Sequence, residues 1–165
     1  MKIVLIGTIA SSVLGFRGPL IRMLISQGHT VYAFANDYTD EQKTILFSWG
    51  AVPVDYELSR SGLNPLKDLH MLWNLLTLLN KLKPDVVLSY FVKPVIYGTL
   101  AALLSNVPKR IAMLEGLGFV FTDQPEGITL KTKFLKFVQL FLYKISFPAI
   151  THLFFLNSDD RNELL

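Results

Sequence analysis

The residues best suited to chemistry lie between Arg110 and Thr122, where an apolar run passes directly into a Glu-Gly-x-Gly turn followed by aromatic residues. The run up to Leu114 has the composition of a buried strand, and Glu115 and Gly116 follow it at once. An open α/β sheet places its ligand site at the carboxyl ends of its strands. Glu115 is therefore the first candidate for chemistry. The alternative is that Glu115 only caps or solvates a tight turn.

A second group of candidate residues follows the first apolar run of the chain. It contains Gly15, Phe16, Arg17 and Gly18, at the expected mouth of the sheet. Backbone amides at a glycine-rich helix start, supported by an arginine, can hold a phosphate or a sugar hydroxyl. The alternative is that Gly18-Pro19 simply begins a helix and that Arg17 is solvated.

The composition predicts one folded domain. The chain has 165 residues, of which 51% are hydrophobic and 18% charged, and its mean hydropathy is +0.40. The longest uncharged runs, Pro94 to Pro108 and Ile145 to Ser158, are too short and too interrupted to span a bilayer. The start of the chain reads as strand, loop and helix rather than as a signal peptide, which predicts a cytoplasmic protein. The absence of cysteine excludes disulfides and thiolate metal sites, and the histidines show no metal-ligand spacing.

Six strands alternating with helices are expected along the chain. Because parallel neighbours need crossover connections, this order predicts an α/β fold with a doubly wound, mostly parallel, Rossmann-like sheet. The expected strands are Lys2 to Gly7, Thr30 to Ala35, Ala51 to Val54, Asp85 to Tyr90, Arg110 to Leu114 and His152 to Leu156. The expected helices are Pro19 to Gln27, Asp40 to Trp49, Pro65 to Leu82, Val95 to Leu104 and Leu130 to Phe147.

Two other classes of ligand are disfavoured. Dinucleotide binding requires G-x-G-x-x-G directly after the first strand, whereas Gly7 is followed only by Gly15 and Gly18, although Asp37 could mimic the ribose-binding acid. The P-loop motif is also missing. Nucleic-acid binding would suit the net charge of +3, but the lysines are few, the aromatic residues fall on buried periods and no recognition motif is present.

Four segments of the chain carry a family resemblance. They are MKIVLIG at the start, GHTVYAFA from Gly28, the run SYFVKPVIYGTLAALLSNVPKRIAMLEGLGFVFT from Ser89 to Thr122, and FLNSDDRNELL at the end. In this order they resemble the N-terminal half of a glycosyltransferase of the GT-B fold, family 4, over essentially the whole chain. The resemblance implies that this domain binds the acceptor, that a second similar domain binds a nucleotide sugar such as a UDP-sugar, and that the active site lies between them.

The resemblance also assigns roles to particular residues. Gly15, Phe16 and Arg17 match the flexible loop after the first strand, which faces the phosphates of the donor and the reacting sugar. Glu115 and Gly116 match the turn after the fifth strand, where many relatives carry His-Gly or His-Asp. Glutamate departs from that pattern, yet it keeps an acceptor for sugar hydroxyls and could act as a base toward an acceptor hydroxyl.

Second-rank contacts are expected on the same rim of the sheet. They are Tyr90, Lys93 and Asn157, the last within an Asn-Ser-Asp cluster. Each has a structural alternative, since Asp159 is a plausible helix N-cap and Lys93 could be a surface charge before Pro94. Neither a metal nor a further cofactor is implied by the family.

The donor-binding half of the family pattern is missing from this sequence. Family members carry a second domain with a pair of glutamates that grip the donor, and this chain ends at Leu165. We therefore expect residues 1–165 to form a single acceptor-binding domain that is inactive alone. Either the chain is an isolated or truncated domain, or another chain supplies the donor-binding domain.

The segment from Lys131 to Phe147 predicts contact with a membrane. At 100° per residue, one face carries Phe134, Val138, Phe141, Leu142 and Ile145, and Lys133, Lys136 and Lys144 gather on roughly the opposite side together with Leu140 and Phe147. Apolar residues interleaved with lysines on an otherwise polar face suit an anionic membrane surface. The alternative is a core helix with a solvated lysine edge, whose Leu140 and Phe147 pack on another domain.

These observations predict the acceptor-binding half of a retaining glycosyltransferase at the cytoplasmic face of the cell membrane. It would transfer a hexose or N-acetylhexosamine from a nucleotide sugar to a lipid-linked saccharide in polysaccharide or glycan biosynthesis. A different class remains open, namely a non-catalytic module that binds the membrane or a partner chain and recruits the acceptor. The third hypothesis, a nucleotide-cofactor enzyme, is disfavoured by the missing glycine fingerprint.

Overall fold

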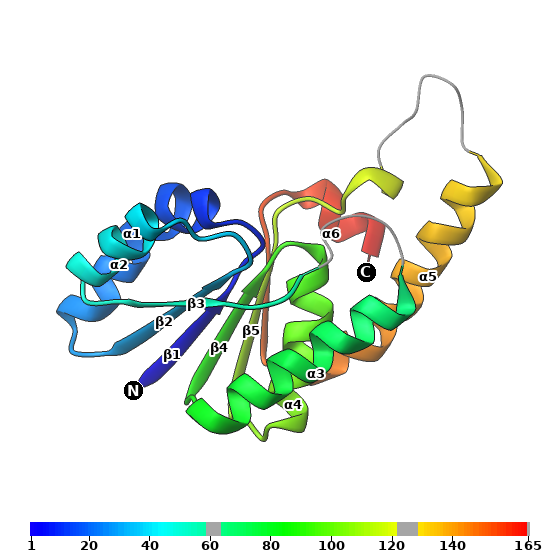
Figure 1. Cartoon of the computed structure of the whole chain (residues 1–165). Coiled ribbons are helices and arrows are strands. Elements are labelled where there is room, and N and C mark those ends of the chain that lie inside the picture. Colours follow the sequence, from blue (N-terminus) through cyan, green and yellow to red (C-terminus); the bar gives the residue numbers. More distant parts are fainter. Residues whose placement is uncertain (59–63, 122–128, 165) are drawn as a thin grey trace.

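The computed structural model describes residues 1–58, 64–121 and 129–164, which form alternating strands and helices (Figure 1). Thr122 and Leu165 lie outside the described residues. The strands are β1 (Lys2–Ile6), β2 (Thr30–Ala35), β3 (Val52–Asp55), β4 (Val86–Tyr90), β5 (Lys109–Leu114) and β6 (His152–Phe155). The helices are α1 (Ala10–Ser26), α2 (Asp40–Ser48), α3 (Pro65–Leu82), α4 (Thr99–Leu104), α5 (Leu130–Ser146) and α6 (Ser158–Leu164).

The strands form one parallel sheet in the order β3-β2-β1-β4-β5-β6. This confirms the predicted doubly wound, Rossmann-like fold. The chain first moves outward from β1 through β2 to β3, then returns to the other side of β1 with β4. The strand order therefore reverses between β1 and β4, which pair in parallel from Ile3 opposite Val86 to Ile6 opposite Ser89. Ligands of open α/β sheets bind outside the carboxyl ends of the strands at such a reversal.

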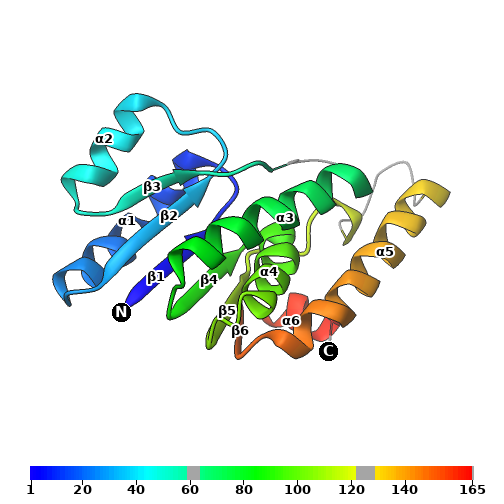
Figure 2. The ribbon, with the colours of Figure 1, turned by 60° about the horizontal axis from the view of Figure 1, so that its bottom comes forward.

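Alternating side chains of β1 explain the layers of helices on the two faces of the sheet. Leu5 packs in one buried cluster with residues of α1 and α2, while Val4 and Ile6 pack in another with residues of α3 and α4. All three side chains are fully buried, as expected for a central parallel strand covered on both faces. Figure 2 shows α1 and α2 together at one side of the sheet, with α3, α4 and α5 grouped at the other.

The first helix begins much earlier than the sequence predicted. We expected Pro19 to begin it, with Gly15 to Gly18 in a loop, but α1 starts at Ala10 and contains the proline in its interior. The carboxylate of Asp37, which follows β2, accepts a hydrogen bond from the Ala10 N–H at 2.7 Å and so satisfies a free donor of the first turn. Pro19 removes one N–H from the middle of the helix. The flanking turns are held by buried Val13 and Ile21, so the helix continues.

Helix α5 packs with a different face from the apolar one that its hydrophobic pattern suggested as a core face, although Leu142 of that apolar face does pack against the buried cluster. Its fully or largely buried side chains are Thr132, Tyr143 and Ser146. Six large apolar side chains are instead exposed, namely Leu130, Phe134, Phe137, Leu140, Phe141 and Ile145. Phe147, expected among the lysines, begins a short 3-10 turn and stacks on Tyr143 with the ring centroids 4.9 Å apart.

The remaining helix boundaries differ from expectation by small amounts. The predicted helix over Val95 to Leu104 begins as a π-helical turn at Pro94–Gly98 and continues as α4. The predicted strand boundaries agree with the structure to within one residue, and α3 spans the residues expected for it. Across residues 1–58, 64–121 and 129–164, no helix combines the length and apolar content that are needed to cross a membrane.

Candidate active site

A cavity of about 300 Å³ opens at the carboxyl edge of the sheet, beside the reversal of strand order. Parallel strands bring their carboxyl ends to the same edge, so segments far apart in the sequence meet here. The lining comes from the segments after β1, β3, β4 and β5: Thr8, Ile9, Leu58, Phe91, Val92, Lys93, Glu115, Gly116 and Gly118. This is the position at which a doubly wound sheet is expected to bind its ligand.

The turn after β5 presents Glu115 to this cavity. Gly116 and Gly118 have φ values of +100° and +84°, a region that glycine adopts without the steric cost that other residues meet. The Glu-Gly-x-Gly spacing is thus explained by backbone geometry, and the turn leaves the Glu115 carboxylate 13% exposed at the cavity wall.

Arg17 of α1 forms an ion pair with Glu115. Its side chain is only 11% exposed, so it is not the solvated residue that the sequence left open. The guanidinium carbon lies 4.4 Å from the centre of the Tyr90 ring, and Nη2 approaches the sulfur of Met113 at 3.5 Å. Burial lowers the pKa of Arg17. Such a pair offsets part of the cost of removing both charges from water, and the loss of either partner leaves an uncompensated buried charge.

The ring of Tyr90 lies against the guanidinium of Arg17. Burial raises the pKa of Tyr90 to about 12, and the nearby Arg17 cation opposes that shift. The ring lies so close to Gly7 that a β-carbon there would be 2.2 Å from the Tyr90 hydroxyl oxygen. Phe91 stacks against Tyr90 at 5.4 Å and has a φ of +69°, a left-handed conformation that is rare for a bulky residue and is often found at functional sites.

Lys93 lines the same cavity but is already paired. Its Nζ lies 2.7 Å from the carboxylate of Asp68 on α3, and the two side chains are 15% and 4% exposed. Lys93 is therefore not a solvated surface charge. The sequence did not single out Asp68 as a site residue, because an acidic residue in the first turn of a helix is common.

Five of the predicted binding residues do not line the cavity. Arg17 and Tyr90 lie next to it through the ion pair with Glu115, whereas the other three lie elsewhere. Gly15 faces open space and Phe16 is 73% exposed, both on α1 rather than in a loop, and neither lines the cavity. Asn157 caps α6, since its side-chain oxygen accepts the Asp160 N–H at 2.7 Å and its amide donates to the Asp160 carboxylate at 2.9 Å. The cap was expected at Asp159 instead. These placements give Asn157 a structural role and leave its predicted contact with substrate as a prediction.

Sequence reasoning missed several residues that line the cavity, among them Thr8, Ile9, Leu58, Phe91 and Val92. Thr8 and Ile9 lie just before the unexpectedly early start of α1, and their position could have been found only if that start had been recognised. The others are apolar residues of a kind that the sequence uses throughout its core. What distinguishes them is that each follows a strand whose carboxyl end lies beside the cavity. That position is known only once the order of the strands in the sheet is known.

The site can bind a polar ligand at an apolar wall. Glu115 offers hydrogen-bond acceptors and Thr8 contributes a hydroxyl-bearing side chain to the lining. Arg17 does not line the cavity, but it places a positive charge against Glu115. The N-terminus of α1 is already neutralised by Asp37. In the described part of the chain, no group of three or more acidic or histidine side chains could hold a metal ion.

The sequence matches a known family over most of its length. Residues 2–157 match the model of the family described as glycosyl transferase 4-like. The N,N'-diacetylbacillosaminyl-diphospho-undecaprenol alpha-1,3-N-acetylgalactosaminyltransferase of Campylobacter jejuni is 30% identical over 162 residues. These residues are 97% of this chain and 41% of that protein, so the chain spans well under half the length of the relative.

Solved structures share the fold. The chain is similar to the crystal structure of MurG from Acinetobacter baumannii, with a TM-score of 0.54 and 20% identity over 72% of this chain and 36% of that one. It is also similar to the UDP-GlcNAc 2-epimerase from Neisseria meningitidis bound to UDP-GlcNAc, with a TM-score of 0.61 and 15% identity over 99% of this chain and 43% of that one. These likenesses concern the fold, whereas the family rests on the sequence match, by which this chain belongs to the glycosyl transferase 4-like family.

Proposed function

We propose that this chain is the acceptor-binding half of a glycosyltransferase that transfers a hexose or N-acetylhexosamine to a lipid-linked saccharide. The observation that carries the proposal is the Arg17–Glu115 pair beside a cavity at the strand-order reversal, in a chain of the glycosyl transferase 4-like family. The Campylobacter relative is named for transfer to a sugar on diphospho-undecaprenol. Its 30% identity supports an acceptor of the same chemical class.

The proposed reaction uses the pair directly. The oxygen of an acceptor hydroxyl bonds to the anomeric carbon of the donor sugar, while the bond from that carbon to the nucleotide diphosphate breaks. Glu115 accepts the proton of the attacking hydroxyl, and Arg17 stabilises the charge that develops on the leaving diphosphate. In a retaining reaction the hydroxyl arrives on the face from which the diphosphate departs. The contact between Arg17 and Glu115 supports such a reaction, because two groups in contact would lie on the same face of the donor sugar.

A nucleotide-sugar-binding domain completes the proposed enzyme, either joined to this chain or on another one. The nucleotide sugar, such as a UDP-sugar, is its substrate, and no metal or other cofactor is invoked. We place the enzyme at the cytoplasmic face of the cell membrane, where a lipid-linked saccharide can be reached.

The outer face of α5 supports the location at a membrane. Phe134, Phe137 and Phe141 are 63%, 68% and 55% exposed. Lys131 and Lys144, on the same helix, are also exposed. An apolar stripe bordered by lysines suits the boundary between anionic head groups and acyl chains.

Sugar transfer tests the proposal. This chain is combined with the part of the Campylobacter relative that it does not match, fused or as a separate chain, and supplied with radiolabelled nucleotide sugars and a bacterial lipid extract. We expect transfer in the combined sample and a loss of at least about 100-fold in Glu115→Ala and Arg17→Ala. Arg22→Ala is the matched control, because Arg22 lies on the same helix but stacks on Trp49 at 4.7 Å, away from the cavity.

Vesicle binding, measured alongside sugar transfer, separates the enzyme from the recruiting module. We expect the chain to sediment with vesicles of phosphatidylglycerol and phosphatidylcholine, and the double variant Phe137→Ser/Phe141→Ser to stay in solution. Phe47→Ser is the control, since Phe47 is 59% exposed on α2. Vesicle binding without transfer from any donor would favour the non-catalytic module. Transfer without vesicle binding would contradict the role given to α5.

A further inference from the structure

The guanidinium of Arg17 has more hydrogen-bond donors than the surrounding residues satisfy. Its Nη2 meets the Glu115 carboxylate and the sulfur of Met113, which is a weak acceptor. Its Nε is buried and has no hydrogen-bond partner among the described residues, and the residue as a whole is only 9% exposed. A buried polar atom without a partner costs free energy and calls for an explanation. An anion with several oxygen atoms would satisfy this donor set better than one carboxylate does.

The other surroundings of Arg17 offer no second anion. The guanidinium carbon lies 4.4 Å from the centre of the Tyr90 ring, so this face of the cation meets an aromatic ring instead of oxygen atoms. Burial lowers the pKa of Arg17, which means that the protein replaces the lost hydration of the cation only in part. Arg17 is therefore a buried cation that a further anion would stabilise.

Glu115 is in contact with both Arg17 and the cavity of the candidate active site. It lines that cavity, whereas Arg17 does not. Among the described residues of the lining, Glu115 is the one acid and Lys93 is the one base. An anion in the cavity thus meets the Lys93 ammonium, and it can reach the Arg17 guanidinium by taking the place of the Glu115 carboxylate.

The turn after β5 leaves Glu115 room to turn aside. Apart from its two chain neighbours, no atom lies within 4 Å of the position that a β-carbon on Gly116 would take. Gly116 and Gly118 both have a positive φ, so the backbone beside Glu115 carries no side chain at either position. A rotation of the Glu115 side chain toward the cavity would release Arg17.

We propose that Arg17 and Glu115 form a partner-exchange site, in which the diphosphate of the nucleotide sugar displaces the Glu115 carboxylate from Arg17. The inference rests on the proposed function for the identity of the donor. The exchange satisfies the donors of Arg17 and frees the Glu115 carboxylate to accept the proton of the attacking hydroxyl. In the absence of a donor the ion pair keeps that carboxylate occupied, so the base acts only when a diphosphate is bound.

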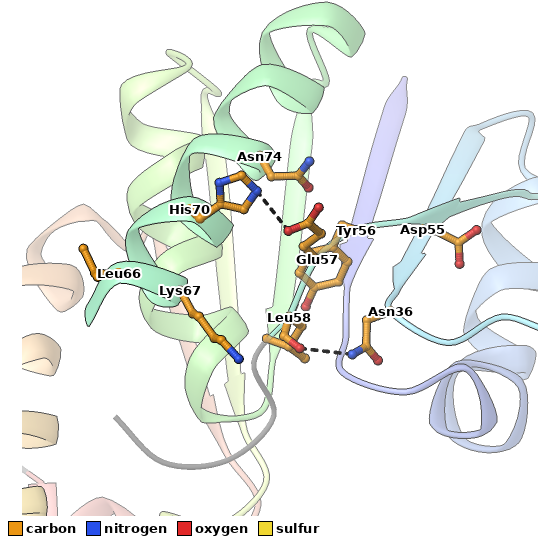
Figure 3. A pocket seen from close by; sticks show the side chains of 9 residues that line it. All are labelled: Asn36, Asp55, Tyr56, Glu57, Leu58, Leu66, Lys67, His70 and Asn74. Atoms are coloured by element: carbon orange, nitrogen blue, oxygen red, sulfur yellow. Dashed lines mark hydrogen bonds and ion pairs between the residues drawn. The ribbon is translucent and has the colours of Figure 1, made fainter. Parts of the chain in front are cut away.

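A neighbouring pair provides the matched control. It lies in a larger cavity of about 850 Å³ between the segment after β3 and α3, where His70 Nε2 is 2.9 Å from the Glu57 carboxylate (Figure 3). The two side chains are 62% and 71% exposed, and Lys67 of the same lining is also exposed. Water already solvates these basic groups, so the removal of the Glu57 carboxylate should not create a strong anion site.

Binding of inorganic pyrophosphate tests the exchange without a donor domain. Pyrophosphate is titrated into the isotope-labelled full chain while the Arg17 guanidinium resonances are followed by NMR. We expect Glu115→Gln to bind it at least about tenfold more tightly than wild type, because no carboxylate then competes for Arg17. Glu57→Gln should bind it as wild type does. Pyrophosphate should also raise the Tm of Glu115→Gln more than that of wild type, since it supplies the missing anion.

A measurement on the wild-type chain needs no variant. The carboxyl resonance of Glu115 should move over the same range of pyrophosphate concentration as the guanidinium resonances of Arg17, because one exchange changes the partner of both. UDP and farnesyl diphosphate then distinguish the two sources of a diphosphate, the nucleotide sugar and a lipid carrier. Displacement of pyrophosphate by UDP would support the proposal, and displacement by farnesyl diphosphate alone would overturn it.

The outcomes separate this inference from the proposed function. Equal affinities for pyrophosphate in wild type and Glu115→Gln, or Arg17 resonances that pyrophosphate does not move, would overturn the exchange. If the combined sample nevertheless transferred sugar, the glycosyltransferase would stand. Exchange with pyrophosphate and UDP, without transfer from any nucleotide sugar, would support the exchange site and contradict the enzyme.

Discussion

The Arg17–Glu115 pair and helix α5 depart from the usual distribution of side chains in opposite directions. At the pair, two charged side chains are hidden at 11% and 13% exposure. On α5, Phe137 and Phe141 face solvent, while Thr132 and Ser146 are buried. Burying charges is costly unless they are paired, and leaving a large apolar side chain exposed forgoes about 1.5–3 kcal/mol. Departures of this kind are expected where a surface serves binding rather than folding.

The largest difference in the free energy of unfolding is expected between substitutions on the two faces of α5. Tyr143 is 2% exposed and stacks on Phe147, so we expect Tyr143→Ala to lower the free energy of unfolding by about 3–5 kcal/mol. Phe137→Ala, on the outer face of the same helix, should change it by less than about 0.5 kcal/mol. Urea unfolding followed by circular dichroism measures both. Equal losses would mean that the outer face is packed in solution and that the comparison is mistaken.

The next effect concerns the buried pair. Arg17→Met or Glu115→Leu alone leaves one charge without its partner and should cost about 3 kcal/mol. The double variant removes both charges, so we expect it to be more stable than either single variant. A double-mutant cycle of unfolding free energies measures the coupling. Additive losses would show that the pair contributes nothing as a pair.

A smaller loss is expected where Tyr90 meets Gly7. In Gly7→Ala the new β-carbon would lie 2.2 Å from the Tyr90 hydroxyl oxygen and 2.4 Å from ring carbon Cζ. The ring must move, which should cost about 1–3 kcal/mol. Tyr90→Phe should not rescue the variant, because Cζ remains.

Gly15→Ala is the control for Gly7→Ala. Apart from its two chain neighbours and the nearby backbone of α1, no atom lies within 4 Å of its β-carbon position, and Gly15 sits within α1. The gain in helix propensity should stabilise the protein by up to about 1 kcal/mol. Thermal unfolding of the two variants should therefore shift in opposite directions, and a shift in the same direction would contradict the close packing at Gly7.

The smallest effect is expected at an exposed ion pair of α5. Lys136 Nζ lies 2.6 Å from the carboxylate of Glu163, and the side chains are 37% and 50% exposed. We expect Glu163→Gln to change the free energy of unfolding by less than about 0.5 kcal/mol, because solvent weakens the attraction. A loss as large as that of Glu115→Leu would remove the distinction between the buried and the exposed pair.

The sheet was predictable because its strands are short apolar runs bounded by glycine, proline or polar residues. Lys2–Ile6 and Val86–Tyr90, for example, read as buried parallel strands in the sequence and pair as such. The start of α1 was not predictable in the same way. Gly15, Gly18 and Pro19 indicate a loop locally, whereas the capping by Asp37 depends on a residue that comes 27 positions after Ala10.

The candidate site was predictable in part. The reversal of strand order brings Glu115 and Arg17 together, and both were singled out from residue type and position. Their direct contact, and the pairing of Lys93 with Asp68, could not be read from the sequence, since they depend on which helix turn faces the sheet edge. The prediction of which face of α5 is buried was wrong for a related reason. A hydrophobic period identifies a face, but the neighbouring sheet determines whether that face is covered.

The exposed aromatic face of α5 also governs the colloidal behaviour of the protein. Phenylalanine side chains on one copy can pack against those on another when no lipid is present, because contiguous exposed apolar surface favours association. The sedimentation coefficient should therefore rise with protein concentration in plain buffer. A mild detergent that covers the face should restore the monomer, and the same detergent is the first additive to include when the protein is concentrated for crystallisation.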